Sequence, residues 1–211
     1  MKGITLAINF ETSTHIEYGY LLNPHIEKDL EEFPIIYDRF CAALYMATMA
    51  YSKSDTPQIS EEARKSAYLR AALAEFTGLV DILSVTMPHI PKNLYSHYKS
   101  SNALFHMLNL LRNYNIHLAK SSLEQKTMKI RYLFDMENEH DHTIDYISNI
   151  SVTELMRLNC ARCYTSKQLE ELVQYFEYQQ HEFGIQTFIV KGILDFSEHV
   201  LEILKNTSKK E

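Results

Sequence analysis

The chain has 211 residues, of which 45% are hydrophobic and 23% are charged, and its formal net charge is −6. These values are ordinary for a globular protein, and the length is sufficient for a buried core. The five glycines stand far apart, which excludes phosphate-binding glycine loops and the nucleophile elbow of α/β-hydrolases. No apolar run reaches about eighteen residues, so a membrane-spanning helix is not expected.

The cysteines and the first residues of the chain predict a cytoplasmic protein. Three cysteines, an odd number, do not suggest a disulfide framework. Residues 1–6 lack the continuous apolar stretch of a secretion signal. We therefore expect a reducing cytoplasm and no membrane association.

Two segments have the alternating pattern of β-strands. Residues 1–22 predict an N-terminal hairpin, because apolar side chains recur at every second position on both sides of the polar residues 11–14. Residues 127–134 show the same alternation and predict a third strand, which would complete a small antiparallel sheet. The alternating residues are Ile4, Leu6, Ile8, Phe10, Ile16, Tyr18 and Tyr20 in the first segment, and Met128, Ile130, Tyr132 and Phe134 in the second.

Most of the remaining chain is expected to be helical. Pro34 suits the first turn of a helix, and Ser151 with Glu154 forms a capping-box pattern. The expected helices cover about residues 34–52, 56 or 60 to 85, 102–120, 152 onward, 166–183 and 185–205. Together these elements predict one compact unit over residues 1–206, with a C-terminal helical part at 152–205 and a disordered tail at 207–211.

The helix at residues 102–120 has two different faces. Its apolar stripe contains Leu104, Met107, Leu108, Leu111, Tyr114 and Leu118. The opposite side carries His106, Asn109, Asn113 and His117. Arg112 lies at the border, where its long side chain can reach the polar side. These polar groups indicate either a binding or self-association surface, or inter-helix hydrogen bonds within the chain.

This helix resembles the signature of the HEPN superfamily, which comprises helical-bundle domains of prokaryotic RNA-cleaving toxins and defence proteins. That signature is an arginine, commonly a polar residue, and a histidine after four to six positions. The chain has Arg112, Asn113 and, after four intervening residues, His117. Residues 68–76 resemble the long helix that precedes the motif. The resemblance covers about residues 34–120 and implies a mainly α fold: a HEPN-like bundle with a small N-terminal antiparallel sheet and additional C-terminal helices.

The resemblance implies metal-independent RNA cleavage by a homodimer, with no cofactor and no metal ion. His117 would act as general base or acid, Arg112 would hold the scissile phosphate, and Asn113 would orient the phosphate or the imidazole. Glu75 could fix Arg112 from the neighbouring helix. Asn109, His106 and Lys120 are the remaining candidate binding residues.

The resemblance also implies a biological setting. The leading hypothesis is a toxin or defence ribonuclease, with an antitoxin or regulatory protein as a further partner. A tyrosine commonly follows the motif histidine by two positions in toxins that are regulated by modification of that tyrosine. Ala119 stands at this position here, which argues against such regulation. The alternative hypothesis is a non-catalytic helical module that binds RNA or a protein.

The charge distribution also bears on an anionic partner. Between His89 and Arg131, seven lysines and arginines are opposed only by Glu124, which gives this segment a charge of +6 and the rest of the chain −12. The segment is either a solvated basic face or the binding surface of a phosphate-bearing ligand.

Two further motifs compete with this reading. Cys160 and Cys163 form a lone C-x-x-C, which indicates either helix-packing cysteines or part of a zinc site. Residues 139–142 (Glu-His-Asp-His) indicate either a solvated acidic loop or metal ligands, and a metal-dependent enzyme is the third hypothesis.

Overall fold

The structure of the chain is a computed structural model that describes residues 7–17, 24–52, 59–118, 123–132 and 134–208, with the backbone alone at 115–118, 132 and 208. The described chain is mainly helical and contains one small antiparallel sheet, as the sequence predicts. The four long or central helices are α1 (Pro34–Met49), α2 (Glu61–Thr86), α3 (Ala103–Leu118) and α5 (Ser166–Ser208). The short elements are α4 (Val152–Leu155) and the 3-10 turns η1 (Lys28–Glu32), η2 (Lys92–Leu94), η3 (His97–Lys99) and η4 (Asn159–Cys163).

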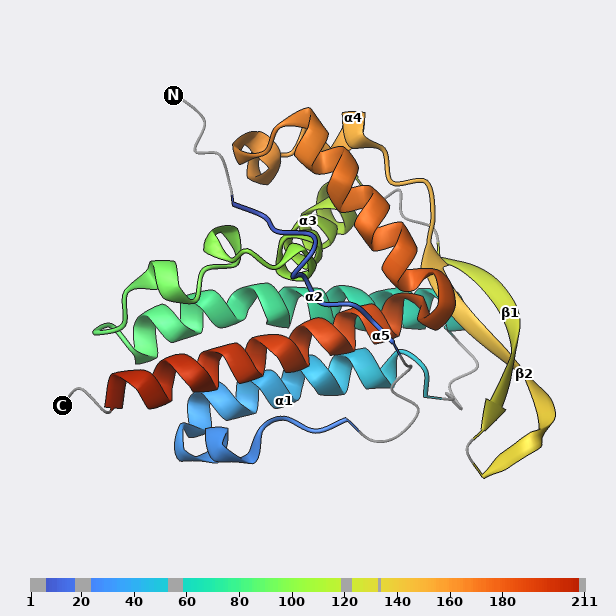
Figure 1. The fold of residues 1–211 in the computed structure, drawn as a ribbon, viewed down its shortest axis with the longest axis horizontal. Coiled ribbons are helices and arrows are strands. Elements are labelled where there is room, and N and C mark those ends of the chain that lie inside the picture. The colour runs from blue at the N-terminus through green and yellow to red at the C-terminus, as the bar shows by residue number, and fades with distance from the viewer. Residues whose placement is uncertain (1–6, 18–23, 53–58, 119–122, 133, 209–211) are drawn as a thin grey trace.

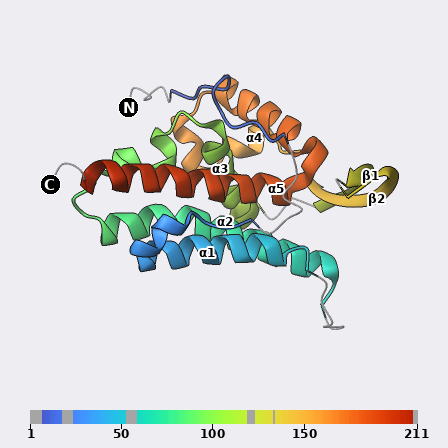
Figure 2. The same ribbon diagram turned by 60° about the horizontal axis from the view of Figure 1, so that its bottom comes forward.

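The helices form a bundle with α3 in its interior. α1, α2 and the second half of α5 lie side by side, and the first half of α5 turns away toward α4 (Figures 1 and 2). α3 packs against both α2 and α5, and every residue from Ala103 to Leu111 is buried. Segments of the chain therefore cover α3 on all sides over this stretch.

Local signals in the sequence set where the helices begin. Pro34 occupies the first position of α1, as predicted. The Ser60 hydroxyl accepts a hydrogen bond of 3.2 Å from the Ala63 amide at the start of α2. The Ser151 hydroxyl accepts one from the Glu154 amide at the start of α4. These caps satisfy backbone donors that a helix leaves unpaired in its first turn.

Gly184 forms the bend in α5. Separate helices are predicted at residues 166–183 and 185–205, and the structure has one long element with non-helical backbone at Gly184 (φ 78°, ψ 174°) between them. A Cβ at this position would lie 2.8 Å from the carbonyl oxygen of Asp145. Both the positive φ and the close approach to Asp145 therefore require glycine. The helix continues to Ser208, so the tail predicted at 207–211 is helical at its first two residues, and residues 209–211 lie outside the described chain.

Replacing Gly184 by alanine is expected to lower the free energy of unfolding by about 3 kcal/mol. Backbone strain at such a conformation contributes roughly 1–3 kcal/mol, and the contact with the Asp145 carbonyl adds to it. Urea denaturation followed by circular dichroism measures the change. Gly78→Ala is the matched control: Gly78 lies within α2 with no atom near its Cβ position, so alanine there should stabilise by about 0.5–1 kcal/mol. Equal stability of wild type and Gly184→Ala would contradict this account of the bend.

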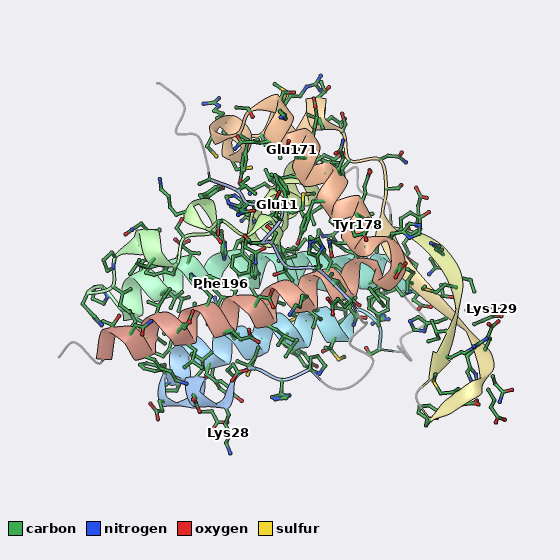
Figure 3. The ribbon with its side chains drawn as sticks, in the orientation of Figure 1. Glu11, Lys28, Lys129, Glu171, Tyr178 and Phe196 are labelled. Carbon is green, nitrogen blue, oxygen red and sulfur yellow. The ribbon has the colours of Figure 1, made fainter. Side chains whose placement is uncertain are left out.

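The sheet is a single hairpin that follows α3. β1 (Leu123–Tyr132) pairs antiparallel with β2 (Asp135–Ile147), with Leu123 opposite Ile147. The strand predicted at residues 127–134 is therefore confirmed as far as Tyr132. Residues 139–142, for which a solvated loop was one reading, belong to β2. The hairpin projects away from the helices, with Lys129 on its outer part (Figures 1 and 3).

The N-terminal hairpin predicted at residues 1–22 is not found in the part that the structure describes. Residues 7–17 contain no strand, and residues 1–6 and 18–22 lie outside the description. The alternating residues Ile8, Phe10 and Ile16 each pack against the helical core. Side chains, not a neighbouring strand, bind the backbone here. For example, the side-chain oxygen of Gln179 accepts a hydrogen bond of 2.7 Å from the Ile16 amide. The sheet is thus C-terminal to α3, not N-terminal to the bundle.

The core contains a histidine in an aromatic cluster. The His97 ring is 3% exposed, stacks on Phe76 at 4.4 Å between centroids, and meets Phe196 edge-on at 4.5 Å. Burial, together with the nearby His106 and His199, lowers the pKa of His97 to about 3. His97 is therefore neutral in the folded protein at neutral pH.

The stability of the protein is expected to fall as the pH drops below the pKa of an ordinary histidine, about 6.5. The unfolded chain takes up a proton at His97 below pH 6.5, while the folded chain does so only near pH 3. The contribution of this group to stability is therefore complete above pH 6.5 and falls by about 1.4 kcal/mol per pH unit below it. The stability difference between wild type and His97→Phe, measured in urea from pH 7 to about pH 4, should change with this slope. A pH-independent difference would contradict it.

Candidate functional site

Two of the polar residues of α3 are used within the fold. The His106 ring is completely buried, its Nδ1 lies 2.8 Å from the Tyr164 hydroxyl, and its Nε2 lies 2.8 Å from the Ser100 carbonyl oxygen. Burial lowers the pKa of His106. Asn109 is 7% exposed. In this structure His106 therefore joins η3 and η4 to α3 and does not face a ligand.

Arg112 and Asn113 are less buried than His106 and Asn109. Both side chains are half-buried, and the Arg112 Nη1 donates a hydrogen bond of 2.9 Å to the Asn113 side-chain oxygen. The Asn113 amide nitrogen donates one of 2.8 Å to the Asn109 carbonyl oxygen, one turn back on α3. Asn113 therefore fixes the Arg112 guanidinium relative to the helix axis.

Arg112 is a half-buried cation without an acidic partner among the residues that the structure describes. It forms no ion pair with any carboxylate there, and its Nε is buried without a hydrogen-bond partner. Arg39 on α1 shows the contrast, because its guanidinium pairs with Glu75 at 3.1 Å. Glu75 was predicted to fix Arg112; its carboxylate is paired with Arg39 instead. The charge of Arg112 is thus not balanced by a carboxylate among the described residues, and the guanidinium can bind an anionic group.

Tyr98 belongs to η3, which packs against α3. Burial raises the pKa of Tyr98, while a hydrogen bond with Asn109 and the charge of Arg112 lower it in part. We call Tyr98, Asn109, Arg112 and Asn113 the Arg112 cluster. Sequence reasoning attached no role to Tyr98, and its signal was weak, because it is one of several aromatic residues in the basic segment.

The last predicted residues of the motif lie at the margin of the description. α3 continues to Leu118, so His117 is on the same helix, one turn beyond Asn113, with its backbone alone described. Lys120 lies outside the described residues. The C-terminal part of α3 is held by Tyr114, whose hydroxyl donates to the Glu154 carboxylate at 2.9 Å.

No family model matches the chain, and no curated protein and no solved structure matches it either. The resemblance to the HEPN superfamily therefore rests on the motif in α3 and on the helix before it. Among the described residues, no helix is both long enough and apolar enough to cross a membrane.

Three of the seven cations of the basic segment pair with acidic groups within the fold. Lys92 pairs with Asp81 at 3.4 Å, and Lys129 and Arg131 pair with Glu139 at 3.8 and 3.0 Å. The second strand of the hairpin supplies the acid, since Glu139 belongs to β2. Arg112, on α3, has no such acidic partner among the described residues.

The two competing motifs take up separate positions. Cys160 and Cys163 stand half-buried on η4, and Cys41 on α1. On β2, His140 lies 2.7 Å from Asp135. No group of three histidine, cysteine, aspartate or glutamate side chains that could hold a metal ion occurs among the described residues.

Proposed function

We propose that the protein is a metal-independent endoribonuclease of HEPN type whose site lies at the C-terminal end of α3. The half-buried Arg112 carries this proposal, because its guanidinium has no acidic partner among the described residues and is oriented by Asn113. A planar guanidinium matches the oxygens of a phosphate group, and a low-dielectric surrounding strengthens their attraction.

In the proposed reaction the ribose 2′-oxygen attacks the adjacent phosphorus. A bond forms between these atoms, the bond from phosphorus to the 5′-oxygen breaks, and a 2′,3′-cyclic phosphate and a 5′-hydroxyl result. His117 takes the 2′-hydroxyl proton as general base, or supplies a proton to the leaving 5′-oxygen as general acid. Arg112 binds the non-bridging phosphate oxygens and stabilises the charge that grows on them. Asn113 positions Arg112.

The proposal includes the homodimer that the resemblance implies, but with a different contact surface on α3. The face of α3 between Ala103 and Leu111 is buried within the chain and is not available for pairing. Two copies would therefore meet around the end of α3 beyond Leu111, which brings two Arg112 clusters together. A toxin or defence role, with an antitoxin or regulatory protein as partner, remains the biological setting that we propose.

A non-catalytic RNA-binding module is the second candidate. It is favoured by His106 and Asn109, which are buried and leave fewer polar groups for chemistry. Arg112 would bind phosphate in either case.

The test is to incubate the purified protein with mixed RNA in EDTA and to identify the ends of any products. The ribonuclease proposal expects fragments with 2′,3′-cyclic phosphate and 5′-hydroxyl ends, and no cleavage of DNA of the same sequence, which lacks the 2′-hydroxyl. RNA binding that depends on Arg112, without cleavage, would favour the binding module. Cleavage only after addition of a divalent metal would contradict the proposed mechanism.

A further inference from the structure

Cys160 and Cys163 are close neighbours on one turn of the chain. Both are free, half-buried and part of η4, and the Cys163 thiol donates to the Cys160 carbonyl oxygen at 3.4 Å. In a 3-10 helix, residues three apart lie above one another, and a rise of about 2.0 Å per residue separates their Cα atoms by about 6 Å. Disulfides span Cα distances of about 4.4–6.8 Å. A disulfide between these two cysteines therefore needs little backbone movement.

The thiols lie in a cationic part of the molecule. The charge of Arg112 acts on Cys160, and the charge of Lys99 acts on Cys163. Burial has the larger effect and raises the pKa of Cys160 to about 11, and it raises that of Cys163 as well. Both groups are thus mainly thiols at neutral pH, and their exchange with a disulfide is slow there and faster at alkaline pH.

A zinc site does not account for this pair. Structural zinc usually takes four ligands, and the described residues contain no third histidine, cysteine, aspartate or glutamate that could complete a site. Simple helix packing does not require two cysteines on one turn, since each is only half-buried. Formation of a disulfide uses both sulfur atoms and needs no further ligand.

We propose that Cys160 and Cys163 form a dithiol site that exchanges with a small disulfide of the glutathione class. The Cys163 thiolate attacks one sulfur of oxidised glutathione, which forms a mixed disulfide and releases one glutathione thiolate. The Cys160 thiolate then attacks the Cys163 sulfur and releases the second. Two protein thiols are oxidised by two electrons, oxidised glutathione is reduced to two thiols, and the two protons from the protein pass to the released glutathione sulfurs.

This inference goes beyond the proposed ribonuclease activity and does not rest on it. η4 packs against α3, and the charge of Arg112 reaches Cys160. Closing the disulfide fixes the conformation of η4, which packs against α3. The redox state and the cleavage of RNA can be measured separately on the same sample, so failure of one leaves the other standing.

The experiment equilibrates the whole chain with increasing ratios of oxidised to reduced glutathione, alkylates the remaining thiols, and records intact masses. Wild type should lose two alkylatable thiols of its three, with Cys41 still reactive, and should carry no glutathione. Cys160→Ser should accumulate one glutathione on Cys163, because no second thiol displaces it. Cys41→Ser is the matched control and should form the disulfide as wild type does. The rate should rise by about tenfold per pH unit from neutral to about pH 9.

Three results would overturn the proposal. All three thiols of wild type could stay alkylatable at every ratio, or glutathione could persist on wild-type Cys163. Loss of the disulfide in Cys41→Ser would show that Cys41 is one of the paired residues.

Discussion

Asp145→Asn is expected to lower the free energy of unfolding by about 3 kcal/mol, because it leaves the buried Lys65 ammonium with only the exposed Glu61 carboxylate, at 3.5 Å, as its counter-charge. Asp145 is 1% exposed on β2, and its carboxylate lies 2.9 Å from the Lys65 Nζ on α2. The Gln125 side chain donates to the other carboxylate oxygen at 3.0 Å. This cluster joins the base of the projecting hairpin to the helices. Urea denaturation followed by circular dichroism measures the loss.

Two control variants test whether the loss of stability comes from the unpaired buried charge. Glu139→Gln breaks exposed ion pairs to Arg131 and Lys129 on the outer hairpin and should change stability by less than about 1 kcal/mol. Lys65→Met combined with Asp145→Leu removes both charges and should be considerably more stable than Asp145→Asn. Equal stability of Asp145→Asn and Glu139→Gln would show that the buried pair does not anchor the hairpin.

Arg112→Ala is expected to reduce the rate of RNA cleavage by about 10²–10³-fold, the usual effect of removing one group that stabilises transition-state charge. Arg112→Lys should recover only a small part of the rate, because an ammonium lacks the planar pair of donors. The two variants are compared with wild type in single-turnover cleavage of one RNA in EDTA.

Arg70→Ala is the matched control for this substitution. Arg70 is exposed on α2, and its guanidinium donates to Ser66 alone among the described residues, so its loss should leave the cleavage rate within about twofold of wild type. Thermal unfolding of each variant shows that the fold is kept. A folded Arg112→Ala protein with the wild-type rate would place any activity elsewhere in the molecule.

Local signals in the sequence predicted the helices closely. Ser60 and Ser151 cap helices where their patterns indicate, and Gly184 separates two helical segments as expected. The strand at residues 127–134 was also detected, but its partner was not. An alternating pattern predicts a strand but not the strand that it pairs with. Residues 139–142 of β2 suggested a loop because both strands of the outer hairpin are largely open to solvent.

The candidate site was predicted only in part, for a related reason. A helical wheel identifies the polar residues of α3 but not the segments that cover them. η3 and η4 bring Tyr98 and Tyr164 onto that side, so His106 and Asn109 are buried while Arg112 stays half-buried. The partner of Glu75 could not be predicted either, because Arg39 and Glu75 meet only when α1 packs against α2.

Cleavage of RNA in EDTA by wild-type, Arg112→Ala and His117→Ala proteins, each shown to be folded by circular dichroism, tests the central claim most directly. The account predicts cleavage by wild type, and loss of at least about 100-fold in both variants. Intact RNA with wild type, or equal cleavage by all three proteins, would contradict a ribonuclease site at the end of α3.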